Sequence, residues 1–100
     1  MIKELLDRND GFVIFGAQVI AYGAYCAIKH LYGVVPECFV VSSLDNNPNE
    51  IDGVRVATTD TIAKDKLIIV GVTELVQKEV VPQLKEQGYN NLFVLTQHEE

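Results

Sequence analysis

The chain has few of the features that mark membrane proteins or nucleic-acid-binding proteins. Its 100 residues include eight Lys and Arg against 14 Asp and Glu, giving a formal net charge of -6, and the basic residues are scattered along the sequence. A nucleic-acid backbone is recognised by concentrated positive charge, so we expect no nucleic-acid partner. No apolar run approaches the roughly 18 residues of a membrane-spanning helix, so the sequence predicts no membrane span.

Cysteine is scarce, and metal ligands are scarce with it. Cys26 and Cys38 are too far apart for a C-x-x-C motif, and only His30 and His98 could join them at a metal. Two reduced, buried thiols are the favoured interpretation, and we expect no bound metal. The N-terminal stretch MIKELLDRND is charged and lacks the apolar region and cleavage site of a signal peptide. This predicts a cytoplasmic protein.

What is present is the composition of one small globular domain. Residues of hydrophobic type make up 48% of the chain, enough for a single core. Short β-prone runs at 12–15, 37–43, 54–57, 66–72 and 90–96 alternate with helical patterns at 1–8, 17–32 and 73–87, and one helical turn is expected within 58–65. This alternation predicts a single three-layer, Rossmann-like α/β domain over residues 1–100, with a five-stranded parallel sheet in the order 3-2-1-4-5. The chain ends directly after a predicted strand, as a domain cut from a longer protein would and as a small complete protein could; we expect the N-terminal part of a longer protein.

The two longer helical patterns predict which side chains face the sheet. Within 17–32 the predicted inward residues are Ile20, Ala24, Ala27, Ile28 and Leu31. Within the last helix they are Leu75, Val76, Val80, Val81 and Leu84. Thr73 is the predicted N-cap of that helix, and Pro82 is expected to kink it.

The stretch GFVIFGAQVIAYGA, residues 11–24, joins a buried strand to a helix through a glycine. A dinucleotide fingerprint places G-x-G-x-x-G/A at such a junction, with a pyrophosphate against the helix N-terminus. Gly16 fits the first position and Ala21 fits the third, where the helix meets the sheet closely. Gln18 occupies the second position, where glycine lets the backbone approach phosphate. The pattern therefore favours a tight strand–helix turn and leaves a phosphate site open.

In the predicted sheet, the carboxyl ends of the first, second and fourth strands meet at a topological switch point, where open α/β sheets bind ligands. The residues expected there are Gly16, Ala17, Gln18, Val19, Ser42, Ser43, Asp45, Gly71, Val72 and Thr73. A site for NAD would require an acid about 20 residues after the glycines. Ser42 and Ser43 stand in that place and Asp45 comes slightly later, either as a ribose or base ligand or as a turn residue. The serines either bind phosphate or simply end the strand.

No catalytic constellation is recognised in the sequence. Ser-His-Asp, Cys-His and paired-carboxylate arrangements are missing, and no catalytic tyrosine–lysine pair is identified. Tyr22 and Tyr25 could stack on a base or sugar, or face another domain, but packing beside the sheet is favoured. Whether the chain belongs to an enzyme is therefore left open.

Four stretches carry a resemblance to a known family: FVIFGAQVIAYGAYCAI, FVVSSLDNNPNEIDGVRV, LIIVGV and VVPQLKEQGYNNLFVL. Together they resemble the small Rossmann-like N-terminal domain of PglD-type bacterial sugar O/N-acyltransferases and of related enzymes of surface-polysaccharide synthesis. The most specific piece is the D-x-x-P loop, 45–48, followed by IDGVRV, 51–56. The resemblance implies binding of a nucleotide-sugar through the residues at matching positions, Gly16, Ala17, Gln18, Ser43 and Asp45. The left-handed β-helix that carries acetyl-CoA binding and chemistry in that family is missing from this chain.

Three hypotheses of function follow. The first is a nucleotide or nucleotide-sugar binding domain, non-catalytic by itself, of a bacterial polysaccharide enzyme, with a UDP-sugar as ligand and a fused catalytic domain or a second copy as partner. The second is an NAD(P)-binding domain of an oxidoreductase or redox sensor. The third is an interaction or scaffold module that binds no small ligand because Gln18 occupies the phosphate position. An exposed edge strand, either 54–57 or the last strand, could pair two copies.

Overall fold

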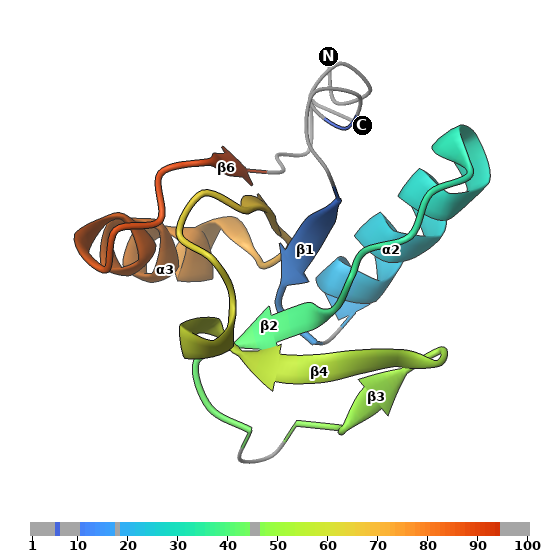
Figure 1. Cartoon of the computed structure of the whole chain (residues 1–100), viewed down its shortest axis with the longest axis horizontal. Helices are drawn as coiled ribbons and strands as arrows, with labels where there is room; N and C mark the ends of the chain where they lie inside the picture. Colours follow the sequence, from blue (N-terminus) through green and yellow to red (C-terminus); the bar gives the residue numbers. More distant parts are fainter. Residues whose placement is uncertain (1–5, 7–10, 18, 45–46, 95–100) are drawn as a thin grey trace.

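The computed structural model describes residues 6, 11–17, 19–44 and 47–94. They form a sheet with the strand order β3-β4-β2-β1-β5-β6, covered by one long helix on each face (Figure 1). The strands are β1 (Phe12–Phe15), β2 (Phe39–Val41), β3 (Glu50–Ile51), β4 (Val54–Thr58), β5 (Leu67–Val70) and β6 (Leu92–Val94). The helices are α2 (Val19–Tyr32) and α3 (Glu74–Glu86), with a 3-10 turn, η1 (Thr59–Thr61), between β4 and β5.

The central strand β1 runs parallel to β2 on one side and to β5 on the other. β4 and β6 extend the parallel part of the sheet, and β3 pairs with β4 in the antiparallel direction. The prediction of an α/β domain is confirmed. The prediction of five strands, all parallel, in the order 3-2-1-4-5 is wrong, because the sheet has six strands and is mixed; its parallel strands alone run β4-β2-β1-β5-β6.

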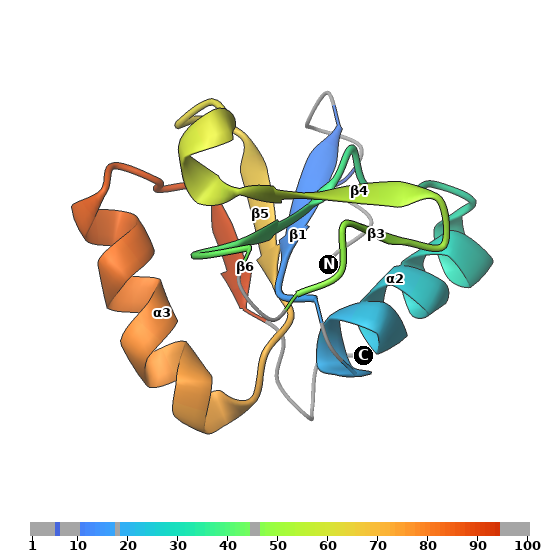
Figure 2. The ribbon, with the colours of Figure 1, turned by 90° about the horizontal axis from the view of Figure 1, so that it is seen from below.

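The additional strand results from a two-residue hairpin at Asp52 and Gly53. Both residues have positive φ, 51° and 80°, as a type I′ turn requires. The turn pairs Ile51 with Val54 across the hairpin. It also corrects the expectation that 54–57 is an exposed edge, because β3 covers that side of β4 (Figure 2).

Alternating side chains of the sheet build two cores, one under each helix. On the α2 face, Ile14 and Phe39 pack with Ala21, Tyr25 and Ile28 of the helix. On the α3 face, a second set packs with Val80 and Leu84, and its members from the strands include Val13, Val40, Ile68 and Val70. The helices therefore lie on opposite faces, which is plain in Figure 2. Continuous burial of β1 and β5 is what parallel strands covered on both faces require.

Helix α2 is rotated relative to its predicted orientation. Ala21, Tyr25 and Ile28 are the buried residues, whereas Ile20 and Leu31 are 45% and 63% exposed. The helix carries two apolar stripes, so periodicity alone could not choose between them. Close packing favours the stripe with Ala21: a Cβ built on Gly16 or Gly71, the glycines that follow β1 and β5, would lie 3.2 or 3.4 Å from the Cβ of Ala21.

Helix α3 begins at the predicted cap and continues through Pro82. Val80 and Leu84 are buried as expected and Val81 is partly buried, but Leu75 and Val76 are 75% and 39% exposed. These two residues form the first helical turn, whose apolar side chains were assigned to the wrong side. Within the predicted helix 1–8 only Leu6 is described, and it packs against the core under α2. Residues 95–96 of the predicted last strand lie outside the described residues.

Among the residues that the structure describes, none of the helices has the length and apolar character needed to cross a membrane.

Candidate functional site

The turn after β1 is closed by two glycines and an alanine that come from three different elements. Gly16 has φ +118°, and a Cβ built on it would lie 2.7 Å from the carbonyl oxygen of Gly71. A Cβ on Gly71 would lie 3.0 Å from the Cα of Ala21. Both positions therefore exclude any larger residue without movement of backbone. The expected roles of Gly16 as the sharp turn and of Ala21 as the helix–sheet contact are confirmed.

The backbone amides of these glycines are already used within the sheet. The Gly16 amide donates to the carbonyl of Val40 at 2.8 Å, and the Gly71 amide donates to the carbonyl of Phe15 at 2.9 Å. Each bond extends a parallel ladder one residue beyond its strand. Neither amide can therefore donate to a phosphate without leaving the sheet, so these glycines shape the edge and do not supply its hydrogen bonds.

The remaining predicted site residues that the structure describes surround this turn at the carboxyl edge of the sheet. Ala17 is half-buried, and Val19, the first residue of α2, is 84% exposed. Ser42 and Ser43 follow β2 directly and are exposed. Because β2 and β5 both flank β1, the segments after these three strands lie side by side. Gln18 and Asp45, on which the phosphate and ribose predictions depend, lie outside the described residues.

Thr73 has a structural role in addition to any binding role. Its Oγ1 accepts a hydrogen bond from the amide of Val76 at 3.4 Å, which caps α3 as predicted. The side-chain amide of Gln77 donates to the carbonyl of Val72 at 3.0 Å and stabilises the connection between β5 and α3. Thr73 is therefore a fixed point beside Gly71 at the start of the helix.

Positive charge is missing from the described part of this edge. The described residues that directly follow β1, β2, β4 and β5 at this edge are 16–17, 42–44, 59–61 and 71–74, and the only charged residues among them are Asp60 and Glu74. Thr58 donates to the Asp60 carboxylate, and Thr61 Oγ1 donates to the Thr58 carbonyl at 2.7 Å. An anionic ligand here would be met by the amides and dipole of the α2 N-terminus and by hydroxyl groups.

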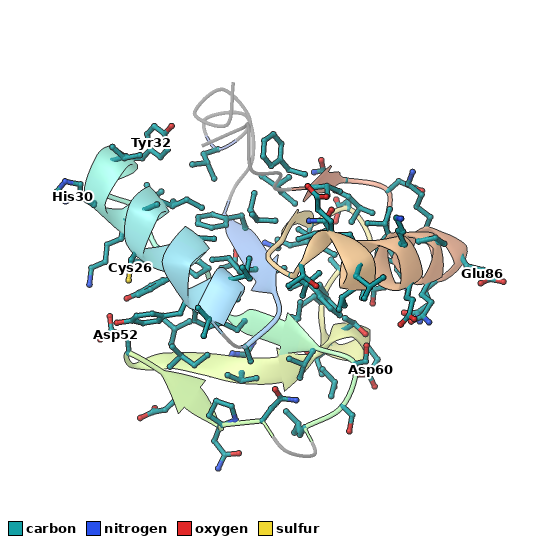
Figure 3. All side chains as sticks on the ribbon, turned by 180° about the vertical axis from the view of Figure 1, so that it is seen from behind. Cys26, His30, Tyr32, Asp52, Asp60 and Glu86 are labelled. Carbon is teal, nitrogen blue, oxygen red and sulfur yellow. The ribbon has the colours of Figure 1, made fainter. Side chains whose placement is uncertain are left out.

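A second polar cluster, which the sequence analysis did not identify, joins α2 to the β3–β4 hairpin. Tyr25 Oη donates to Oδ2 of Asp52 at 2.6 Å, and Lys29 Nζ lies 3.5 Å from Tyr25 Oη and 3.6 Å from Asp52 Oδ2. The Tyr25 ring is buried against Phe39, with ring centroids 5.6 Å apart. Figure 3 shows Asp52 at the hairpin tip beside the helix.

The electrostatics of this cluster favour the ionised carboxylate and the protonated tyrosine. The hydrogen bond from Tyr25, followed by the charge of Lys29, lowers the pKa of Asp52. The same bond to Asp52 raises the pKa of Tyr25, and the bond to Tyr25 raises the pKa of Lys29. A tyrosine whose pKa is raised is a poor general base at neutral pH. The cluster is therefore suited to holding the hairpin against the helix.

Two sequence signals could have revealed this cluster. Tyr25 and Lys29 are four residues apart, so on a helix their side chains are neighbours. Asp52 and Gly53 form the dipeptide typical of a two-residue hairpin turn. The predicted strands 37–43 and 54–57 leave the segment between them as a connection without a strand, and β3 in that segment is the element that brings Asp52 to the helix.

The two thiols have different environments. Cys38 is buried, and burial raises the pKa of its thiol, whereas Cys26 is exposed on the outer side of α2 (Figure 3). The expectation of two buried thiols is therefore wrong for Cys26, which lies opposite the helix face that packs on the sheet. Both thiols are free, and the described residues contain no cluster of His, Cys, Asp and Glu able to hold a metal ion.

Comparisons with known proteins add no further assignment: no protein-family model matches the chain, and neither a curated protein nor a solved structure matches it.

Proposed function

We propose that this chain is a non-catalytic domain that binds a nucleotide or nucleotide-sugar at the carboxyl edge of its sheet. The observation that carries the proposal is the topological switch point at β1 and β5. The two strands are neighbours, yet the helices that follow them cover opposite faces of the sheet. In open α/β sheets, this is the place where ligands bind.

The proposed ligand position follows from the groups at this edge. The first turn of α2, which contains Ala17, Gln18 and Val19, would receive the phosphates through its amides. Ser42, Ser43 and Asp45, on the segment after β2, would contact the ribose or the sugar. Gly71 and Thr73 would form the opposite wall, because the Gly71 carbonyl lies directly against the Gly16 turn.

The charge of the edge bears on which nucleotide is favoured. The described segments there carry carboxylates and no cation, so each additional phosphate on a ligand is unfavourable. A UDP-sugar, whose two phosphates are both esterified, is favoured over NADP(H), whose 2′-phosphate ordinarily needs an arginine. NAD(H) is the second candidate, and it is disfavoured by serines at the position where its ribose acid would stand.

The wider role rests on the resemblance to PglD-type N-terminal domains. In that context the domain would hold a nucleotide-sugar for a catalytic domain on the same or another chain, in bacterial surface-polysaccharide synthesis.

The test is an NMR titration of isotope-labelled protein with UDP-GlcNAc, UDP and NADH in parallel. We expect saturable amide shifts in residues 16–19 and 42–45, with UDP-GlcNAc binding most tightly. Asp45→Ala should weaken binding by about tenfold, as loss of a charged hydrogen bond does. Asp65→Ala is the matched control, because it removes the same charge at the opposite edge of the sheet, before β5, and should leave binding unchanged.

Two outcomes would contradict the proposal. Absence of shifts with all three ligands at millimolar concentration would reject a nucleotide site in the natural chain. Equal weakening by Asp45→Ala and Asp65→Ala would show that the loss of binding is not specific to the proposed site. Gln18→Gly then distinguishes the remaining alternative: binding gained by this variant alone would indicate a scaffold module whose phosphate position is filled by Gln18.

A further inference from the structure

The outer side of α2 carries an apolar face that the sheet does not use. Ile20 and Leu31 are 45% and 63% exposed, and Gly23 and Ala27 between them are also exposed. On a helix these four positions share one side, since they follow one another at intervals of three, four and four residues. Figure 2 shows α2 at the edge of the molecule, away from α3 and on the opposite face of the sheet.

Charge distinguishes α2 from α3, the helix on the other face of the sheet. Helix α2 contains no acidic residue, in a chain with 14 acids and a net charge of -6, and its only basic residues are Lys29 and His30. Helix α3, which covers the other face, has an exposed side that includes Glu74, Lys78, Glu79, Lys85 and Glu86. Two copies of an acidic protein can therefore approach each other through α2 without bringing carboxylates of their helices together.

No contact among the described residues explains the glycine at position 23. It lies in the middle of α2, its φ is not positive, and a Cβ built on it would meet nothing within 4 Å. A glycine at such a position weakens the helix relative to alanine and gains no packing inside the molecule. Close approach of another backbone from outside would account for it.

We propose that this face, Ile20, Gly23, Ala27 and Leu31, pairs with the same face of a second copy of the chain. The order of side-chain sizes is large, small, small, large, which is the same when read in either direction. A two-fold axis near the middle of α2 therefore places Ile20 of one copy opposite Leu31 of the other, and Gly23 opposite Ala27. An isologous contact requires a surface that is complementary to itself. A contact with a different protein would not require this symmetry, so the order of side-chain sizes favours a second copy of the chain as the partner.

The geometry of the helix supports a close, antiparallel crossing. The 14 residues of α2 span about 21 Å, and small residues at the centre let two helix axes approach within about 8 Å. The antiparallel arrangement also opposes the two helix dipoles. A contact of one helix per protomer is small compared with a standard interface, so we expect a weak dimer that forms at high protein concentration.

The test is sedimentation equilibrium of the whole chain with a pair of matched variants. Leu31→Glu places a charge in the proposed contact, and Leu75→Glu makes the same change at an exposed leucine of α3. We expect the natural chain to dimerise, Leu31→Glu to weaken dimerisation by at least about tenfold, and Leu75→Glu to leave it unchanged. A natural chain that remains monomeric up to about 1 mM, or equal effects of the two variants, would overturn the proposal.

Gly23→Gln supplies a test that misfolding cannot imitate. Glutamine is a better helix former and finds open space in the monomer, so the midpoint of thermal unfolding at low concentration should rise by about 2–6 °C. Its side chain would block the crossing, so dimerisation should be lost in the same protein. A variant that is more stable and still dimerises as the natural chain does would overturn the proposal.

A distance measurement separates this dimer from one formed by edge strands. A spin label on Cys26 lies on α2 near its centre, while Cys38 is buried. The proposed crossing keeps two labels within about two helix diameters, roughly 25 Å or less. A dimer whose label-to-label distance is much longer would show that another surface pairs the copies.

Discussion

The packing at the end of β1 makes a quantitative prediction for Gly16→Ala. The substitution adds a methyl group at φ +118°, 2.7 Å from the Gly71 carbonyl oxygen. The left-handed backbone costs about 1–2 kcal/mol for a residue with a Cβ. The contact with backbone costs a further ~1–3 kcal/mol, as overpacking of a tight core does. The free energy of unfolding should therefore fall by about 2–5 kcal/mol.

Gly33→Ala provides the control that separates these two costs. Gly33 also has a positive φ, +68°, but a Cβ there would meet nothing within 4 Å. Its replacement should therefore cost only the backbone term, about 1–2 kcal/mol. The difference between the two variants measures the contact together with any difference in backbone cost between φ +118° and φ +68°.

The assay is urea-induced unfolding followed by far-UV circular dichroism, at one temperature for all three proteins. A domain of this size has a total stability of about 5–15 kcal/mol, so Gly16→Ala should remain partly folded and its transition measurable. The slopes of the transitions must agree for the comparison to hold. If Gly16→Ala costs no more than Gly33→Ala, the close contact between the Gly16 turn and β5 described above is wrong.

Three further predictions concern the hairpin, the thiols and α3. The pKa of Asp52 is lowered in the folded chain, so the stability that its charge contributes is present above the unfolded value of about 4 and is lost as pH falls through the folded value. Urea titrations should therefore show the natural chain losing stability relative to Asp52→Asn as the pH falls through this range, whereas a constant difference between the two proteins would contradict the role of the charge. In the native protein, a thiol reagent should react rapidly with the exposed Cys26 and with the buried Cys38 only after unfolding. Cys26→Ser should therefore abolish the rapid phase of the thiol reaction. A rapid phase that survives in this variant would place Cys38 at the surface. On α3, Leu84→Ala should cost about 2–5 kcal/mol and Leu75→Ala less than about 0.5 kcal/mol by urea unfolding, and similar costs would contradict the orientation of the helix.

The sequence was sufficient to predict the parallel part of the sheet because its strands are apolar and bounded by clear turn signals. The runs at 12–15 and 67–70 are buried on both faces, as a continuous β-branched or aromatic run indicates. The rotation of α2 could not be predicted in the same way. Two apolar stripes compete on that helix, and the decision depends on Ala21 meeting Gly71, which are 50 residues apart.

The candidate site was only partly predictable for a different reason. A motif indicates which segments follow adjacent strands, so the positions of Gly16, Ser42 and Thr73 at one edge could be expected. It does not indicate which backbone amides the sheet has already used. The hydrogen bonds of Gly16 and Gly71 to neighbouring strands are long-range pairings, and they decide that these glycines shape the site without donating to a ligand.

The central place of β1 has a consequence for how the chain is made. Its partner β5 pairs Leu67 with Phe12, 55 residues further along, so at a synthesis rate of roughly 5–20 residues per second β1 waits several seconds for its second neighbour. The β3–β4 hairpin, by contrast, closes within microseconds once it is made. The first strand of the sheet to be synthesised is thus among the last to be enclosed, and its FVIF run stays open to other chains during that interval. Slow translation should therefore lower the yield of folded protein even where native stability is unchanged.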